Sequence, residues 1–349
     1  MIASPEPQVK PTLLVVEDDP AMLVALRDIL EGAGYNVRTA ANGMAAMAIL
    51  GGENPALILS DISMPVMDGI ELFESVRRMP AGATIPFIFL TARGTREDIF
   101  AGKSLGADDY ITKPITSQEL LAAVQARLHR SDELMVAQLQ AAYKASLLML
   151  ANAIEGRDHY TRDHVDRVNA YAQAMAADLE WDDERKETME YGAILHDIGK
   201  IAVRDALLSK TGPLSADEWG EMREHPRAGG KMIEGIPYLA RALPTVLYHH
   251  ERWDGSGYPE GLAAEAIPEE ARLLAVVDTF DAMTTDRPYR PSFPPDTAME
   301  EILDQSGRQF DPHMVEAFRR CWEDGRLQKI MALWRRRQQQ DPQPTPAPS

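Results

Sequence analysis

The chain has little cysteine, no signal-peptide core and an excess of acidic over basic residues. Among its 349 residues there is one cysteine, Cys321, which excludes an intrachain disulfide framework and fits a reducing compartment. The formal net charge of −18 argues against a DNA-binding surface, which needs a basic footprint. We find no apolar run long enough to span a bilayer. The expectation is a cytoplasmic protein that binds neither DNA nor membrane.

The length suits two domains, and the first half alternates strand-like and helix-like segments. Repeated β–α units predict an α/β doubly wound fold, in which helices cover both faces of a five-stranded parallel sheet. We expect a flexible N-terminus at 1–11 and this domain at 12–130. The expected strands are 13–16, 37–40, 57–59, 85–90 and 110–111, and the expected helices are 21–30, 44–50, 69–78, 97–105 and 117–130.

Polar side chains follow several of these strands. Glu17 and Asp18 follow the first, and Asp61 follows the third. Because ligands bind at the carboxyl ends of parallel strands, these acids should meet there, and their oxygens suit Mg²⁺. A carboxylate in that cluster can be a nucleophile toward a phosphoryl group. Thr91 and Lys113, after the fourth and fifth strands, would then contact the phosphoryl oxygens.

Four stretches of the first half read VVEDDP (15–20), SDISMPVMDG (60–69), FLTA (89–92) and DDYITKP (108–114). With them, this half resembles the receiver domain of two-component response regulators. The resemblance implies phosphorylation of Asp61 by a cognate histidine kinase, and a cis peptide bond between Lys113 and Pro114. The alternative is a silent scaffold that keeps only the fold. The other implied site residues are Glu17 and Asp18, with Asp61, for Mg²⁺, Lys113 for the phosphoryl group, and the switch pair Thr91 and Tyr110.

Residues 131–154 form a helical connector without glycine or proline. Apolar residues recur in it every four positions, which predicts a helix with one apolar face. The helix from the first domain can therefore run through the connector and couple the two halves, by pairing with a second protomer in a homodimer. The alternative is that this segment is the first core helix of the next domain. Both interpretations can be true, each for different turns of the helix. The stripe consists of Met135, Leu139, Tyr143, Leu147 and Ala151.

The second half centres on His196 and Asp197, which supply adjacent nitrogen and oxygen ligands for a metal. Met189 and Ala193 precede His196 at helical spacing, so the run should end a helix, with Gly199 as its stop. Nitrogen and oxygen ligands without a thiol suit Fe or Mn better than a sulfur-bound zinc. Scattered histidines of the surface or core are the alternative. The further candidate ligands are His225, His249, His250 and Asp278.

Residues 155–332 read as mostly helical and carry several motifs. These are HDIGK (196–200), His225-Pro226, HHERWDGSGYPEGL (249–262), IPEEARLLAVVDTFDAMTTDRPYR (267–290) and FDPHMVEAF (310–318). With them, this half resembles the HD-GYP domain, an all-α branch of the HD superfamily of metal-dependent phosphohydrolases. The substrate that the resemblance implies is cyclic di-GMP, hydrolysed to pGpG and more slowly to GMP.

The resemblance also implies a role for each residue of this site. Asp197 would bridge two transition-metal ions, and Lys200 would neutralise charge that develops on the phosphoryl group. Arg287 and Arg290 would contact substrate phosphates, because arginine forks suit oxyanions. Tyr258 either contacts the substrate or only packs beside the site. The implied metal ligands are His196, Asp197, His225, His249, His250 and Asp278.

At one position the chain differs from some members of the family. Those members carry a glutamate four residues before the histidine that is His164 here, and they bind a third metal. Tyr160 stands at that position here, so we expect a two-metal site with His164 beside it or as a weak ligand. Asp281 is expected to be a structural or supporting carboxylate. His159 and His313 are expected to be exposed or satisfied locally.

Residues 333–349 form a tail whose proline-rich end cannot pack a core and should be disordered. The whole sequence predicts a response regulator whose receiver controls a cyclic di-GMP phosphodiesterase. One alternative is a phosphohydrolase acting on another cyclic dinucleotide. The other is a non-catalytic interaction protein that binds partners such as diguanylate cyclases, and the presence of every implied ligand and of Lys200 weighs against it.

Overall fold

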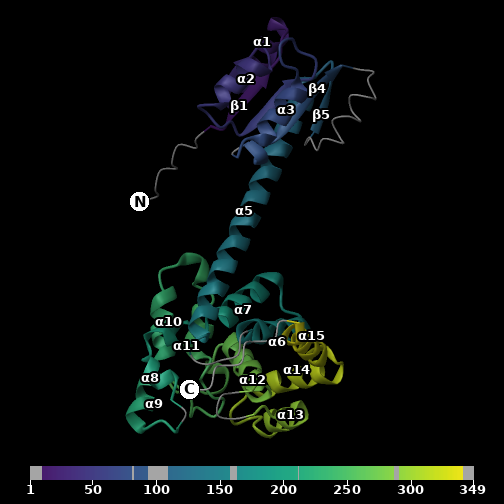
Figure 1. Ribbon diagram of the computed structural model, residues 1–349. Helices are drawn as coiled ribbons and strands as arrows, with labels where there is room; N and C mark the ends of the chain where they lie inside the picture. Colours follow the sequence, from purple (N-terminus) through teal and green to yellow (C-terminus); the bar gives the residue numbers. More distant parts are fainter. Residues whose placement is uncertain are drawn as a thin grey trace, which may run out of the picture. The chain divides into compact units, whose positions relative to one another are not determined.

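The computed structural model describes residues 10–80, 82–92, 109–157, 163–210, 212–286 and 291–340. The chain divides into two compact units, Met1–Ala141 and Ala142–Ser349 (Figure 1). The first unit is built on a parallel sheet and the second consists of helices. The predicted fold class, an α/β domain followed by an all-α domain, is therefore confirmed.

The sheet of the first unit has the strand order β2-β1-β3-β4-β5, and every pair of neighbours is parallel. Strand β1 pairs on both sides, with Leu13 opposite Val37 of β2 and opposite Leu57 of β3. The predicted strand 85–90 begins two residues later than expected. The strands are β1 (Thr12–Val16), β2 (Asn36–Ala40), β3 (Leu57–Asp61), β4 (Phe87–Ala92) and β5 (Asp109–Lys113).

Helices cover both faces of the sheet because alternate strand residues point to opposite sides. Leu14 and Val16 of β1 pack with α2 and α3 in one core, whereas Leu13 and Val15 pack with α1 and α5 in the other. The expected helix 97–105 lies outside the described residues. The helices of this unit are α1 (Pro20–Gly32), α2 (Gly43–Leu50), α3 (Gly69–Arg78), the 3₁₀ helix η1 (Gly82–Thr84) and the start of α5 (Ser117–Glu155).

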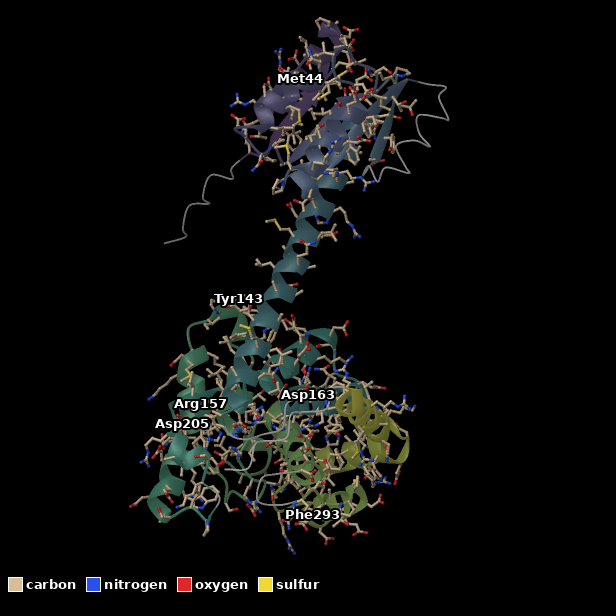
Figure 2. All side chains as sticks on the ribbon, viewed as in Figure 1. Met44, Tyr143, Arg157, Asp163, Asp205 and Phe293 are labelled. Carbon is tan, nitrogen blue, oxygen red and sulfur yellow. The ribbon has the colours of Figure 1, made fainter. Side chains whose placement is uncertain are left out.

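Helix α5 is unbroken over 39 residues, as the connector sequence predicted. Its first turns bury Leu120 and Val124 in the first unit, and its last turns bury Ala151 and Ile154 in the second. Tyr143, labelled in Figure 2, packs edge-on against Tyr238 with ring centroids 5.1 Å apart. The final turns of α5 are thus the first core helix of the second unit.

Helix α5 also differs from one expectation drawn from the sequence. By length and composition it is apolar enough to cross a membrane, with a mean hydropathy of 1.3 over its most apolar 18 residues, and it is the one such helix in the described part of the chain. The apolar residues responsible lie mostly on its exposed middle turns. The expectation that no apolar segment is long enough was therefore wrong for this helix.

The second unit packs its helices around α12 (Glu269–Thr284). Phe280 of α12 meets Tyr171 and Phe318 edge-to-face, with ring centroids 5.5 and 5.0 Å apart. The other helices are α6 (His164–Asp178), α7 (Asp183–Leu195), η2 (Ile198–Ala202), α8 (Asp205–Leu208), α9 (Ala216–Met222), α10 (His225–Ile233), η3 (Pro237–Leu239), α11 (Leu243–Tyr248), η4 (Ala264–Ala266), α13 (Pro295–Asp304), α14 (Pro312–Glu323) and α15 (Arg326–Gln340).

The start of the expected disordered tail is helical, because α15 continues to Gln340. Trp334 is 9% exposed, and the guanidinium of Arg337 lies 4.2 Å from its ring centroid. The buried indole explains why the helix extends past residue 333. Residues 341–349 lie outside the described residues.

Asp178, the last residue of α6, links this helix to α14 and α15. Its carboxylate accepts hydrogen bonds from Arg320, at 2.8 Å, and from Arg326. Burial alone would raise the pKa of Asp178, but the two guanidinium groups outweigh it and hold the pKa below the ordinary 3.8. A carboxylate with a lowered pKa stabilises the fold above its unfolded-state pKa, and this contribution is lost as the pH falls through the folded pKa.

We therefore expect Asp178→Asn to reduce the free energy of unfolding by about 1–2 kcal/mol at neutral pH. The difference from wild type should shrink as the pH falls below 3.8, the ordinary pKa. Urea unfolding across a pH series measures both effects. Asp304→Asn, at the exposed end of α13, is the matched control. A pH-independent difference would contradict the assignment.

Candidate metal centre and phosphorylation site

Three acidic side chains meet at the carboxyl ends of β1 and β3. Glu17, Asp18 and Asp61 each place an oxygen within 4.8 Å of the others. Lys113, the last residue of β5, donates to Glu17 Oε2 at 2.8 Å and approaches Asp61 Oδ2 at 2.9 Å. The structure thus brings together the residues that the sequence placed at this edge of the sheet.

The charges of this pocket favour cations. Burial and the neighbouring charge of Asp61 raise the pKa of Glu17, against the opposing effect of Lys113. Burial would lower the pKa of Lys113, but its hydrogen bonds to Glu17 and Asp61 outweigh burial and raise it, so the ammonium stays charged. The Lys113-Pro114 bond is cis, as predicted. The three acidic side chains outnumber the one ammonium group, and their oxygens are ligands that suit Mg²⁺.

The predicted switch residues lie on neighbouring strands. Thr91, in β4, is 2% exposed. Tyr110, in β5, stacks on Phe89 with ring centroids 5.6 Å apart, and burial raises the pKa of its hydroxyl. Thr91 is therefore buried, and Tyr110 is half-buried with its ring against Phe89.

In the second unit, the helix before the His-Asp pair ends earlier than predicted. Helix α7 ends at Leu195, and Gly199 lies inside η2, so the expectation that Gly199 stops a helix was wrong. The glycine is required by close packing. A Cβ at Gly199 would lie 1.9 Å from the carbonyl oxygen of His225 and 2.5 Å from the nitrogen of Gly229. The missing side chain lets η2 rest on α10 and brings Asp197 to His225.

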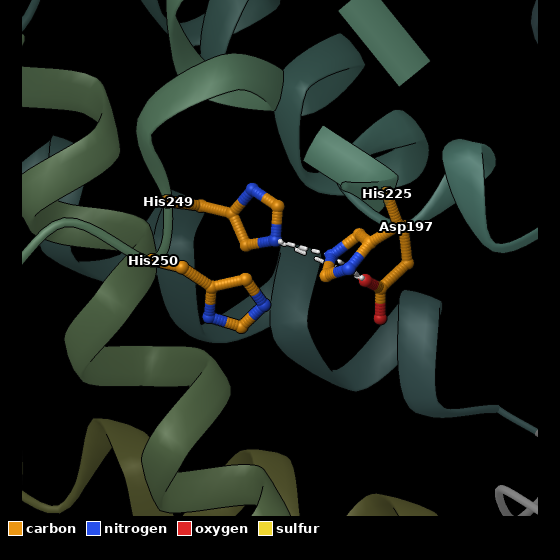
Figure 3. A group of neighbouring side chains, drawn as sticks. All are labelled: Asp197, His225, His249 and His250. Carbon is orange, nitrogen blue, oxygen red and sulfur yellow. Dashed lines mark hydrogen bonds and ion pairs between the residues drawn. The ribbon is translucent and has the colours of Figure 1, made fainter. Parts of the chain in front are cut away.

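Asp197, His225, His249 and His250 form the first group of candidate ligands, with ligand atoms all within 4.8 Å of one another. Asp197 Oδ1 lies 3.1 Å from His225 Nε2 and 3.8 Å from His249 Nε2. Figure 3 shows the rings of His225 and His249 directing nitrogens toward the Asp197 carboxylate. His249 and His250 come directly after α11, and their ring centroids are 4.1 Å apart.

His164, His196 and Asp278 form a second group of candidate ligands. His196 Nε2 lies 3.2 Å from Asp197 Oδ2, and His164 Nε2 lies 3.4 Å from Asp278 Oδ1. Lys200 also approaches Asp197 Oδ2, at 2.8 Å. The two oxygens of Asp197 therefore face different groups, which is the arrangement of a bridging carboxylate.

Most of the histidines are oriented in the same way. In each of three rings, Nδ1 is within hydrogen-bond distance of the backbone oxygen of the residue three positions earlier, which leaves Nε2 for the centre. Ligand histidines in metal sites are commonly held by such contacts. The pairs are His196 with Ala193 at 2.9 Å, His225 with Met222 at 2.7 Å, and His249 with Val246 at 2.9 Å.

The protonation states largely suit metal binding. Burial and the neighbouring histidines hold the pKa values of His249 and His250 well below the ordinary 6.5, so both rings are neutral. Burial would raise the pKa of Asp197, but the charges of Lys200 and His196 outweigh burial and hold it well below its usual range. Burial would lower the pKa of His196, but Asp197 raises it to about 9, so His196 would release a proton when a metal binds.

His164 is held by a buried carboxylate rather than by the backbone. Asp281 Oδ2 lies 2.7 Å from His164 Nδ1, and Arg167 Nε donates to Asp281 Oδ1 at 2.7 Å. Asp281 is thus the supporting carboxylate that the sequence predicted. His313 is exposed. Four residues singled out from the sequence lie outside the described residues: His159, Tyr160, Arg287 and Arg290.

A loop after His250 lies against the candidate ligands. The ring of Tyr258 stacks on His250 with centroids 4.8 Å apart. Glu251, 3% exposed, accepts hydrogen bonds from the backbone N–H groups of Glu260, Gly261 and Leu262 at 2.7–3.1 Å. Glu251 was not among the residues expected from the sequence, because no local pattern shows that a glutamate will accept hydrogen bonds from a loop nine residues away.

Comparisons with known proteins match both units. Residues 13–125 match the response regulator receiver domain, and residues 148–314 match the HD domain. The chain is 34% identical over 328 residues to the cyclic di-GMP phosphodiesterase response regulator RpfG of Xanthomonas campestris, covering 88% of this chain and 87% of that protein. A cyclic di-GMP phosphodiesterase of Thermotoga maritima is 31% identical over 355 residues, 95% of this chain and 94% of that protein.

The second unit also resembles an enzyme with another named substrate. The 3′3′-cGAMP-specific phosphodiesterase 2 of Vibrio cholerae is 33% identical over 194 residues, which covers 54% of this chain and 37% of that protein.

Proposed function

The chain belongs to the family of response regulators that join a receiver domain to an HD domain, and on this premise we propose that it is a metal-dependent cyclic di-GMP phosphodiesterase under receiver control. We infer the activity mainly from Asp197, which is buried and whose two oxygens face two groups of histidines. We place the receiver at 12–130 and the phosphohydrolase domain at 155–332, in the cytoplasm.

The donor set fits a pair of transition-metal ions. Asp197 would bridge them, because each of its oxygens already faces a different ligand group. Fe or Mn suits these nitrogen and oxygen donors. Cations bound there would attract the phosphodiester oxygens and lower the pKa of water, which would supply hydroxide at neutral pH. The remaining ligands would be His196 and Asp278 on one side, and His225, His249 and His250 on the other.

The chain's own residues bind and orient the substrate. Lys200, 6% exposed, places its ammonium beside Asp197, where it would neutralise charge that develops on the phosphoryl group. Arg287 and Arg290 would hold the substrate phosphates, and Tyr258 would contact the substrate from its position against His250. Opening of the ring gives pGpG first, and GMP forms more slowly because the linear product must be cleaved again.

A second candidate substrate is another cyclic dinucleotide, and the similarity of the second unit to a 3′3′-cGAMP-specific enzyme favours testing it. Purified protein should be given cyclic di-GMP and 3′3′-cGAMP in parallel. A higher kcat/KM on cyclic di-GMP supports the primary proposal. A preference for 3′3′-cGAMP would replace it with the second candidate.

The first unit would receive the signal. Asp61 would take a phosphoryl group from a histidine kinase, with Mg²⁺ held by Asp61, Glu17 and Asp18, and Lys113 would pair with the phosphoryl oxygens. Thr91 and Tyr110 would pass the change on. Helix α5 would couple the units through a homodimer, since its middle turns expose apolar side chains. Those chains are Leu134, Met135, Val136 and Leu139.

We expect Asp61→Asn to abolish the response to phosphorylation while leaving the unstimulated hydrolysis unchanged. An amide cannot form the acyl phosphate, and Asp61 belongs to the first unit whereas the histidine groups belong to the second. The measurement is hydrolysis with and without a small-molecule phosphodonor. Asp28→Asn, an exposed aspartate of α1, should respond as wild type does. A response that survives in Asp61→Asn would place the acceptor elsewhere.

A further inference from the structure

An exposed tryptophan and an exposed arginine lie next to the candidate metal centre. Trp219, in α9, is 46% exposed, and Arg223 follows it by four residues, directly after the end of the helix. The Arg223 guanidinium lies 5.8 Å from the ring centroid of Trp219 and 5.4 Å from that of Tyr258. Tyr258 in turn stacks on His250, a candidate metal ligand. A single aromatic ring therefore links Arg223 to a ligand of the centre.

The guanidinium of Arg223 keeps its hydrogen-bond donors available. Its contacts with the residues that the structure describes are to the faces of the two rings, and none of those residues forms an ion pair or a hydrogen bond with its side chain. An arginine over an aromatic face still directs its N–H groups outward in the guanidinium plane. The glutamates close to it in sequence pair with other cations: Glu218 with Lys210, Glu221 with Arg204, and Glu224 with Arg227.

The loop that carries Tyr258 is held in place from two sequence positions outside it. Arg227, in α10, donates to the backbone oxygen of Pro259 and to Glu260, both at 3.0 Å. Glu251 accepts hydrogen bonds from the backbone N–H groups of residues 260–262 at 2.7–3.1 Å. Both contacts restrict the positions that Tyr258 can take, so its ring contacts His250 and Arg223 together.

A cyclic dinucleotide needs more than the metal centre to bind it. When one phosphodiester lies at the cations, the bases on the adjoining riboses must lie beside them. Bases stack on aromatic side chains and on arginine. Guanine also presents two adjacent acceptors, O6 and N7, which an arginine fork binds together, whereas adenine presents one acceptor beside an amino donor. The available donors of Arg223 therefore match guanine better than adenine.

We propose that Trp219, Arg223 and Tyr258 form a guanine-binding subsite beside the metal centre. The two rings offer faces for stacking, and Arg223 donates to O6 and N7 of the base. This inference rests on the proposed function and deepens it, because it assigns the preference for a guanine nucleotide to particular residues. Arg223 is a specificity-determining residue here, since it contacts the base and not the phosphodiester that reacts.

The test measures how Arg223→Ala changes the binding of two cyclic dinucleotides to the full-length, metallated protein. The KM for cyclic di-GMP should rise about tenfold or more while kcat stays close to wild type, because the base is held equally in the ground and transition states. Cyclic di-AMP carries the same riboses and phosphodiesters, so it competes for the same centre. Its inhibition constant should change by less than about twofold, because adenine does not pair with both donors.

Two further variants complete the comparison. Trp219→Leu removes a ring face, and it should weaken both dinucleotides, since stacking does not distinguish the bases. Arg337→Ala is the matched control, because Arg337 also lies over a tryptophan, with its guanidinium 4.2 Å from the ring centroid of Trp334 in α15. This control should match wild type with both dinucleotides. All variants should keep the metal content of wild type, measured on the assayed samples.

An unchanged KM for cyclic di-GMP in Arg223→Ala would overturn the proposal. Equal weakening of cyclic di-GMP and cyclic di-AMP in that variant would also overturn it, because Arg223 would then contact a phosphate or a ribose. Loss of metal from Arg223→Ala would show that the residue supports the centre instead of the base. If wild type hydrolyses cyclic di-GMP and Arg223→Ala does so with the same KM, only this inference fails. If fully metallated wild type does not hydrolyse cyclic di-GMP, the proposed function fails.

Discussion

Replacing Asp197 with asparagine should lower the hydrolysis of cyclic di-GMP by about 10³-fold or more, which corresponds to about 4 kcal/mol of transition-state stabilisation. Asp197 is the one described side chain whose two oxygens face both histidine groups, Oδ1 toward His225 and Oδ2 toward His196. An amide of the same shape cannot bridge two cations as an anion. The variant should also lose metal, which elemental analysis of the assayed sample measures.

The matched control for this variant is Asp183→Asn. Asp183 is a fully exposed aspartate in the first turn of α7, the helix that leads to the site. It should retain wild-type hydrolysis and metal content. If Asp197→Asn keeps activity within about tenfold of wild type, the bridging role is wrong. If it loses activity but keeps all metal, Asp197 acts on the substrate rather than as a ligand.

The second large effect is expected at Gly199. Gly199→Ala should reduce the free energy of unfolding by about 3 kcal/mol or more, or prevent folding of the second unit. The new Cβ would lie 1.9 Å from the carbonyl oxygen of His225, and backbone atoms cannot rotate away as a side chain end can. Separation of η2 from α10 would also move Asp197 away from His225. Chemical unfolding and metal content measure the two consequences.

Gly220→Ala tests whether the effect belongs to the position rather than to the substitution. A Cβ at Gly220, in helix α9, meets nothing within 4 Å. We expect this variant to be as stable as wild type or more stable by about 0.4–1 kcal/mol, because alanine reduces the entropy of the unfolded chain. Similar stabilities of the two variants would contradict the account of the η2–α10 contact.

The receiver half was readable from the sequence because its geometry follows from strand order. In a parallel sheet every carboxyl end lies at one edge, so the residues after the strands meet there whatever the loops do. Glu17, Asp61 and Lys113 could therefore be grouped without coordinates, and the structure brings them within hydrogen-bond distance. The observed strand ends differ from the expected ones by one or two residues, as at β4, because hydrogen bonding rather than apolar content determines where a strand ends.

The helical half was less readable because its site depends on contacts between distant segments. The candidate ligands were recognised as a set, but the sequence could not show that Asp197 faces both groups. Gly199 was assigned to a helix end because glycine commonly stops helices, whereas here it allows two backbones to touch. No local pattern shows which side chains meet across helices.

The most direct test of the central claim is the hydrolysis of cyclic di-GMP by the purified full-length chain, with the metal content of the same sample determined. The assay should be run with and without a phosphoryl analogue on Asp61, and products should be resolved at early times. The account predicts turnover by the metallated protein, with pGpG as the first product and a rate that changes with the analogue. No turnover by a fully metallated sample, in either state of the receiver, would contradict it.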